Sequence, residues 1–302
     1  MTDGSIQTGD LAAFTVDLEL FSDTMAFRKL NMDWPHEENG EAGVDRLLEI
    51  FDRHGIKSTF FVVASHAQSQ KSLLRRIAGM GHEISSHSMT HQLFTNQTLE
   101  SITREVRESK EILEDVIGEA VFGFRAPAFT INEKAALAIE QSGFRYDSSV
   151  IPCQHIPGWY GFPRAHRHPF LIRELFGEIS GEVMEFPVST NPATRTPISG
   201  LWLRLFGIRY VLWGIHAQIK RREVPVLYVH PWEVVELPRV DGIPWRMHFR
   251  TGEKTIDMIE TIIRRVNVRF IPLREMLERD EAPRNNANPS VVVRSANKTL
   301  SV

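Results

Sequence analysis

The chain of 302 residues contains one cysteine, Cys153, and no excess of either charge sign. With a single cysteine it cannot form an intrachain disulfide, a CxxC zinc knot or a redox pair. Any bound metal must therefore use histidine and carboxylate ligands. The formal net charge of −3 and the pI near 6.5 lack the strongly basic character of nucleic-acid-binding domains, so we do not expect nucleic acid as a partner.

Long apolar runs are also missing. The first ten residues are polar and acidic, without the basic start and apolar core of a secretory signal, so we expect the chain as given to be cytoplasmic. No window is apolar for long enough to form a membrane-spanning helix. The nearest candidate is 201–219, which Arg204, Arg209 and His216 interrupt. Two interpretations stay open for it: peripheral contact with a membrane surface, or, more ordinarily, a buried or pocket-lining helix.

Strand-like and helix-like patterns alternate along most of the chain, as in a parallel sheet whose strands are connected by helices. The run Phe60-Phe61-Val62-Val63 is apolar on both faces, which is typical of a strand buried within such a sheet. Expected strands lie at 11–16, 56–64, directly before His87, 121–124, 144–146, 226–229 and 268–271. Expected helices lie around 44–51, 73–77, 99–116, 135–142, 253–265 and 274–277.

Proline-rich segments interrupt this alternation at 152–169, which we expect to be a surface loop, and at 187–199, which we expect to cover a pocket. No change in composition divides the chain into two domains. We therefore expect a flexible N-terminus at 1–10, one catalytic domain at 11–279 and a disordered, asparagine-rich tail at 280–302.

Two histidines, His87 and His91, are four residues apart just after an expected strand. On a helical or tightly turned backbone these positions share a face, and neutral imidazole is a common ligand of Zn²⁺. Twelve histidines produce some close pairs by chance. The pair therefore needs a third ligand and catalytic groups elsewhere in the chain to indicate a metal site.

Two carboxylates, Asp17 and Glu19, follow the first expected strand at positions i and i+2. On an extended backbone they point the same way, and both can line one site. Taken alone, Asp17 is explained about equally well as a loop or capping residue and Glu19 as a solvated side chain. In parallel α/β architectures, however, functional groups gather at the carboxyl ends of the strands.

Six side chains with suitable chemistry fall at or just beyond the ends of different expected strands. Two histidines and one carboxylate leave metal coordination positions open for water and substrate, as in catalytic zinc sites. A carboxylate that is not a ligand can accept a proton from water, a separate histidine can donate one to a leaving group, and a buried arginine keeps its neighbouring carboxylate ionised. The six are Asp17, Glu19, His87, His91, Arg125 and His230.

These residues carry a resemblance to the polysaccharide deacetylase family, also described as NodB-homology or carbohydrate esterase family four. The matching segments run in order from about Leu11 to Leu277: 15–19, 87–91, 125–129, 146–149 and 227–230. The resemblance implies an α/β fold, a distorted (β/α) barrel with about seven strands, related to the TIM barrel. It also implies a hydrolase that uses a divalent metal to remove N-acyl groups from amino sugars.

Transferred residue by residue, the resemblance makes Asp17 the general base and Arg125 the residue that holds it. His230 becomes the general acid, and the backbone N–H near Ala128 joins the oxyanion site. The implied metal ligands are Glu19, His87 and His91, with Zn²⁺ as the expected ion and other divalent metals as alternatives.

The sequence departs from the usual family pattern at two places. The first motif normally has adjacent aspartates, whereas this chain has Asp17-Leu18-Glu19; a branch of the family does use a spaced acid pair. Ala128 replaces a usual aromatic, so only a backbone role is transferred to it. The segment 230–233, with the later Arg250-Thr251-Gly252, resembles the subgroup associated with exopolysaccharide biosynthesis.

Other residues have less specific interpretations. Asp147 either supports the site or forms a turn, and Trp232 either stacks on a sugar or packs in the core. Trp202 and Trp213 are further stacking candidates with the core as the ordinary alternative. His82 and Glu83 are expected in packing or supporting hydrogen bonds. We do not expect ligands at the three loop histidines, His155, His166 and His168.

The expected function is N-deacetylation of an amino sugar in a polysaccharide, an oligosaccharide or a lipid-linked glycan. The alternatives are an allantoinase-like hydrolase of cyclic amides and a carbohydrate-binding pseudoenzyme. The expected partner is an acetylated glycan, and the sequence leaves the oligomeric state open.

Overall fold

The first strand, β1 (Leu11–Leu18), is buried along its whole length and lies inside the sheet. Its side chains alternate between two environments, as a period of two requires. Phe14 and Val16 pack in the core between sheet and helices, whereas Leu11 and Ala13 belong to a second cluster in the concave interior of the sheet. Asp17 continues the interior row at the carboxyl end of the strand. The apolar part of β1 thus fixes the direction in which its acidic end points.

The sheet curls around this interior cluster, and its central strands are all parallel, as a βα repeat produces. Seven strands are parallel neighbours in the order β7-β5-β4-β3-β2-β1-β8. Two short strands complete the sheet: β6 pairs antiparallel with β7, and β9 pairs with the start of β1. Their bounds are β2 Thr59–Val62, β3 Glu83–Ser86, β4 Gly123–Phe124, β5 Tyr146–Asp147, β6 Phe170–Leu171, β7 Met184–Glu185, β8 Val226–Val229 and β9 Arg269–Phe270.

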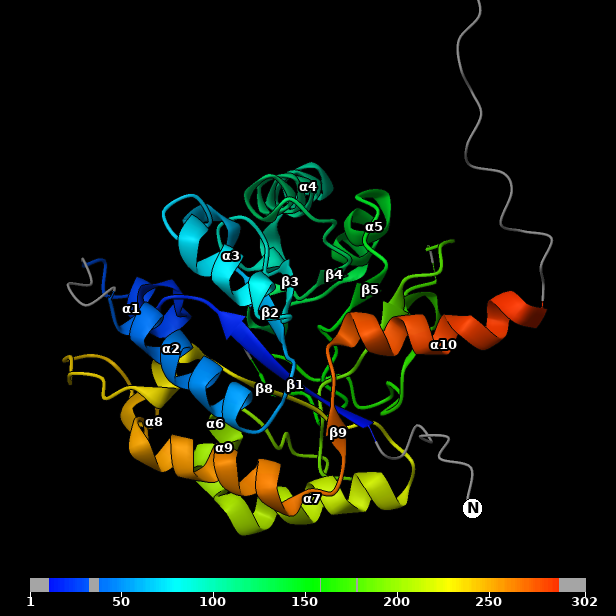
Figure 1. Cartoon of the computed structure of the whole chain (residues 1–302). Helices are drawn as coiled ribbons and strands as arrows, with labels where there is room; N and C mark the ends of the chain where they lie inside the picture. The colour runs from blue at the N-terminus through cyan, green and yellow to red at the C-terminus, as the bar shows by residue number, and fades with distance from the viewer. Residues whose placement is uncertain (1–10, 33–37, 158, 178, 288–302) are drawn as a thin grey trace, which may run out of the picture.

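Helices surround the convex side of the sheet, with α3, α4 and α5 along one side of Figure 1 and α7 and α9 along the other. The sequence explains the ends of α4: Thr98 accepts a hydrogen bond from the N–H of Ser101, and Gly118 ends the helix at a φ of 77°. The bounds are α1 Met25–Arg28, α2 Glu38–Arg53, α3 Lys71–Gly79, α4 Leu99–Ile117, α5 Glu133–Gln141, α6 Leu201–Phe206, α7 Ile208–Lys220, α8 Trp245–His248, α9 Glu253–Arg265 and α10 Leu273–Ala287.

The computed structural model describes residues 11–32, 38–157, 159–177 and 179–287. The expectations for 1–10 and 288–302 lie outside these residues. Within the described part of the chain, no helix has the length and apolar character needed to cross a bilayer.

The predicted α/β fold, a distorted barrel, is confirmed as a curled, predominantly parallel sheet. Three local expectations differ from the structure. The last helix was expected at 274–277 but continues to Ala287. The segment 187–199 does not line the pocket that opens at the carboxyl end of β1. The segment 201–219 forms two helices rather than one, because Gly207 adopts a φ of 79° between α6 and α7.

Candidate active site

The six sequence-predicted side chains meet at the carboxyl end of the sheet. His87 follows β3, Arg125 follows β4 and His230 follows β8, and all three converge on the end of β1. Strands that are far apart in sequence but adjacent in a parallel sheet deliver their terminal residues to one edge. The structure therefore brings together the residues that the strand-end argument selected.

Asp17 and Arg125 form a buried ion pair at the base of the site. Arg125 Nη1 lies 2.6 Å from Asp17 Oδ1, and both side chains are shielded from solvent. The guanidinium also donates to Thr15 Oγ1 and to the carbonyl and hydroxyl oxygens of Ser148, and it lies 4.1 Å from the ring centroid of Phe61. These contacts fix the carboxylate, so that Oδ2 faces the pocket, 4.0 Å from His230 Nε2.

His87 and His91 are presented by a tight turn rather than by a helix. Ser88 and His91 have φ values of 65° and 57°, and Ser88 Oγ accepts the N–H of His91. Glu105 on α4 holds the same turn by accepting both the N–H and the hydroxyl of Thr90. The imidazole centroids are 4.8 Å apart, so the turn places both rings at one point.

The donor atoms fit a divalent cation. His87 Nδ1 lies 2.7 Å from the carbonyl oxygen of Arg125, and His91 Nδ1 lies 3.1 Å from that of Asp23. Each Nδ1 must donate to its carbonyl, which leaves an unprotonated Nε2 on the neutral ring. His91 Nε2 faces Glu19 Oε2 at 2.7 Å. Burial lowers the pKa of His91, but Glu19 and Asp23 outweigh burial and raise it, so without a metal this contact holds a proton. A divalent cation bound to both atoms would take the place of that proton.

Charge in the site agrees with this assignment. Burial lowers the pKa of His87 well below its usual value, and the neighbouring His91 lowers it further, which favours the neutral ligand form. Burial alone would raise the pKa of Glu19, but three nearby histidines outweigh burial and lower it. Glu19, His87 and His91 are the group of potential ligands in the described residues whose donor atoms lie within 4.8 Å of one another.

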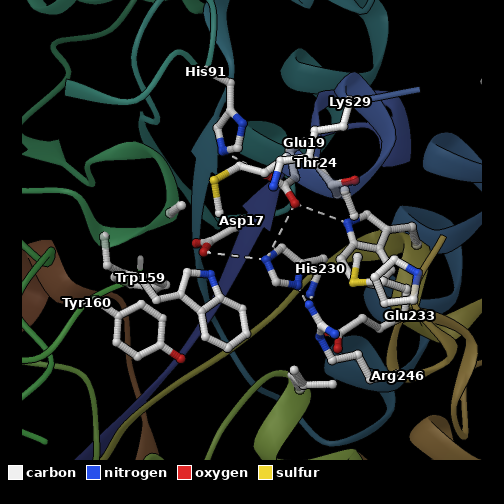
Figure 2. Close-up of a pocket in the computed structure, with 18 of the residues that line it drawn as sticks. Asp17, Glu19, Thr24, Lys29, His91, Trp159, Tyr160, His230, Glu233 and Arg246 are labelled. Carbon is white, nitrogen blue, oxygen red and sulfur yellow. Dashed lines mark hydrogen bonds and ion pairs between the residues drawn. The ribbon is translucent and has the colours of Figure 1, made fainter. Parts of the chain in front are cut away.

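His230 lies next to both carboxylates, with its Nε2 4.0 Å from Asp17 Oδ2 and 3.6 Å from Glu19 Oε1 (Figure 2). Its Nδ1 lies 3.0 Å from Glu233 Oε2, and the other oxygen of Glu233 accepts from Arg204 Nε at 2.7 Å. Burial lowers the pKa of His230, but the carboxylates of Glu19, Glu233 and Asp17 outweigh burial and raise it to about 9. Burial likewise opposes ionisation of Glu233, yet Arg204 and His230 lower its pKa to about 2. His230 is thus held as a proton donor by an ionised partner.

Trp232 lines the pocket but is almost fully buried, so little of its ring is open to a substrate. Its indole stacks on His230 with centroids 4.7 Å apart, and its Nε1 donates to Glu19 Oε1 at 3.2 Å. Trp232 therefore lies against Glu19 and His230 and orients both side chains.

A pocket of about 400 Å³ opens over these residues. Trp159 and Tyr160, from the loop predicted at 152–169, line one side, and Lys29 and Arg246 line the opposite side (Figure 2). Ala128 lies at the pocket wall with a φ of 46°, in the turn that follows Arg125.

Asp147 does not reach the pocket. Its carboxylate accepts from the hydroxyl of Ser149, which in turn accepts the N–H of Ala126, directly after Arg125. The residue pairs in register with Glu185 on β7. Asp147 therefore supports the loop that carries Arg125 and has no path to substrate.

The other residues considered from the sequence, Glu83 and four further histidines, lie away from the site. His82 and Glu83 lie at the start of β3, at the opposite end of the strand from the site, where His82 Nδ1 accepts from the N–H of Ser58. The loop residues His155, His166 and His168 belong neither to the ligand group nor to the pocket wall.

Sequence reasoning missed several supporting residues. Asp23 holds His91 through its carbonyl and is itself bound by His66 and Arg28. Glu233 had a usable signal, because it follows His230 by three residues in a capping turn. Arg204 had none, since it reaches Glu233 from a helix 29 residues away in sequence.

The site and fold define an α/β half-barrel with an open histidine, histidine and carboxylate group at the carboxyl ends of its strands. Residues 33–146 match the polysaccharide deacetylase family model, and residues 148–278 match the model of a domain of unknown function, DUF3473. The N-terminal half of the chain is thus similar to polysaccharide deacetylases, and the following part is similar to DUF3473. The first match contains His87, His91 and Arg125, and the second contains His230, Glu233 and Arg204.

Among curated proteins, the chain is similar to a peptidoglycan deacetylase of Helicobacter pylori, with 26% identity over 112 residues, 37% of this chain and 38% of that protein. It is also similar to a chitooligosaccharide deacetylase of Rhizobium leguminosarum, with 35% identity over 68 residues, 22% of this chain and 32% of that protein. The aligned part thus spans only about a third of each relative.

Solved structures share the fold over nearly the whole chain. A putative polysaccharide deacetylase from Mycobacterium smegmatis superposes with a TM-score of 0.69 at 20% identity, covering 100% of this chain and 96% of that one. A probable polysaccharide deacetylase from Pseudomonas aeruginosa gives 0.62 at 18% identity, with 92% of each chain covered. An allantoinase gives 0.61 at 17% identity, with 90% of each covered. These likenesses concern the fold alone.

Proposed function

We propose that the protein is a metal-dependent hydrolase that removes an N-acetyl group from an amino sugar in a glycan. One observation carries the proposal: Asp17 and His230 face each other across 4.0 Å beside the Glu19, His87 and His91 group, at the floor of one pocket. A pseudoenzyme that only binds carbohydrate would have no need for this combination of buried charges.

The chemistry follows from the partners of each side chain. A divalent cation held by Glu19, His87 and His91, most simply Zn²⁺, would supply Lewis acidity at the acyl carbonyl. Asp17, oriented by Arg125, takes a proton from the attacking water. His230, kept charged by Glu233, gives a proton to the nitrogen as the C–N bond breaks, which releases acetate and the free amine. The turn at Ala128 brings backbone to the pocket wall, where its N–H serves as an oxyanion donor.

The choice of a glycan over a cyclic amide is supported by the family match and by the named activities of the curated relatives. The segment 230–233 adds a resemblance to the exopolysaccharide-associated subgroup, and it supplies both the acid and the carboxylate that holds it. A cytoplasmic location and the identity of the glycan carrier stay predictions. The allantoinase-like reaction is the second candidate, since the fold is shared.

The test is an assay of the zinc-loaded protein against chitooligosaccharides, acetylated exopolysaccharide fragments and allantoin, with released acetate and ureide opening as readouts. We expect acetate from at least one glycan and no turnover of allantoin. Turnover of allantoin alone would overturn the deacetylase proposal. Binding of glycans without release of acetate, by protein with a full complement of zinc, would support the pseudoenzyme instead.

A further inference from the structure

A stripe of exposed residues runs along the outer side of α6 and α7. On α7, the exposed residues Arg209, Trp213, His216 and Lys220 follow one another at intervals of three or four residues, so they share one face. Phe206, at the end of α6, is also exposed, and its ring lies 4.8 Å from that of Tyr210 on α7. Phe206 is 47% exposed and Trp213 49% exposed, which is unusual for side chains of this size. We call these five residues the α6–α7 stripe.

The stripe is not needed to bury α7. The opposite face of that helix supplies Val211, Leu212 and Ile215 to the core, and α7 contacts α9 on that side. About half of the surface of Phe206 and of Trp213 is therefore open to solvent.

The charge of the segment is one-sided. Residues 200–222 contain no aspartate or glutamate, although the whole chain has a net charge of −3. Within the described residues, neither Arg209 nor Lys220 forms an ion pair. By contrast, the exposed side of α4 mixes both signs and pairs Arg107 with Glu111. An acid-free basic and aromatic face is complementary to a surface that is itself anionic.

Aromatic side chains connect the stripe to the pocket. Tyr210 lies between Phe206 and Trp213, with ring centroids 4.8 and 5.9 Å apart, and Trp202 lies 5.5 Å from Phe206. Trp202 Nε1 donates to the hydroxyl of Tyr160 in the pocket wall. The exposed face thus begins at the helix that borders the active site.

We infer that the α6–α7 stripe docks on a bilayer surface rich in anionic lipids, with Phe206 and Trp213 entering the headgroup region and Arg209 and Lys220 contacting lipid phosphates. Amphipathic helices with aromatic and basic residues bind at this depth. A neutral glycan is the less suitable occupant, because it offers no anionic group to Arg209 and Lys220. Docking is independent of the chemistry in the pocket.

The test is flotation of the zinc-loaded full chain with vesicles of phosphatidylcholine alone or with 30% phosphatidylglycerol. We expect binding only to the anionic vesicles, and loss of that binding as salt rises. R209Q/K220Q is expected to reduce the partition coefficient about 25-fold, at about 5-fold per cation. The matched control is R104Q/R107Q on α4, which removes two exposed arginines elsewhere and is expected to bind normally.

A second measurement covers the aromatic residues. Brominated phosphatidylglycerol should quench part of the tryptophan fluorescence of the wild-type protein, and W213F should lose that part. Binding to anionic vesicles that survives both R209Q/K220Q and F206S/W213S would overturn the inference. So would binding to alginate in place of vesicles, which would assign the stripe to an anionic glycan. D17N, which should lose activity, is expected to bind vesicles like the wild type, so that failure of the two proposals can be distinguished.

Discussion

Glu233 lies behind His230, with its Oε2 3.0 Å from the imidazole Nδ1 and its Oε1 2.7 Å from Arg204 Nε. The ionised Glu233 accepts the Nδ1 proton and stabilises the imidazolium form of His230, in which Nε2 also carries a proton and points toward Asp17. All three residues of this chain of contacts lie in the part of the sequence that matches DUF3473. That segment therefore completes the site instead of forming a separate unit.

Replacing Glu233 with glutamine should weaken the acid. The pKa of His230 is raised to about 9 by neighbouring carboxylates, so the protonated form is present below that pH and is lost as pH rises. A bound cation would offset part of the effect of Glu19. In E233Q the alkaline limb of kcat/KM should move to lower pH by about one unit, the scale of one charged hydrogen bond. E236Q, which alters an exposed neighbour, should leave the limb in place; an unchanged limb in E233Q would contradict the role of Glu233.

Asp17 should be required for turnover but not for metal binding. D17N keeps the shape of the side chain while removing the base, so kcat should fall about 10²- to 10⁴-fold. Zinc content, measured by elemental analysis after dialysis, should equal that of the wild type. Loss of zinc in D17N would instead make Asp17 a ligand.

Glu19 should be required for the metal. Wild-type protein should unfold at a higher temperature when zinc is added, since a ligand at 100 times its Kd stabilises the native state by about 2.7 kcal/mol. E19A should lose the shift and its zinc. W232F, which removes the N–H that orients Glu19 and part of the ring that stacks on His230, should bind zinc about 10-fold more weakly. Full zinc occupancy in E19A would overturn its assignment.

Much of this site could be predicted from local patterns. The two-residue period of β1 determines that Asp17 points into the barrel, and the spacing of His87 and His91 suits a turn that presents both rings. The strand-end rule then placed Arg125 and His230 beside them. Each of these signals lies within a few residues of its own strand.

The rest depended on contacts across the chain. Asp23 reaches His91 over 68 residues, and Arg204 reaches Glu233 from a helix with no motif of its own. Strand β7 has only two residues, too few for a visible alternation, so its buried Glu185 could not be recognised. The core interpretation of Trp213 was wrong, because periodicity alone does not show which face of α7 meets α9.

The buried carboxyl pair of Asp147 and Glu185 should make stability depend on pH. Burial and the neighbouring Asp147 raise the pKa of Glu185 well above its usual value, so folding takes up a proton. Its contribution is full below the unfolded pKa and declines as pH rises toward the folded pKa, by up to about 1.4 kcal/mol per pH unit. E185Q keeps the shape of the side chain and removes its titration. The free energy of unfolding of E185Q minus that of the wild type should therefore increase from pH 6 to pH 8. Urea unfolding at pH 6, 7 and 8 measures this, with E49Q on the exposed side of α2 as control. Parallel curves for wild type and E185Q would show that Glu185 is already ionised in the folded protein.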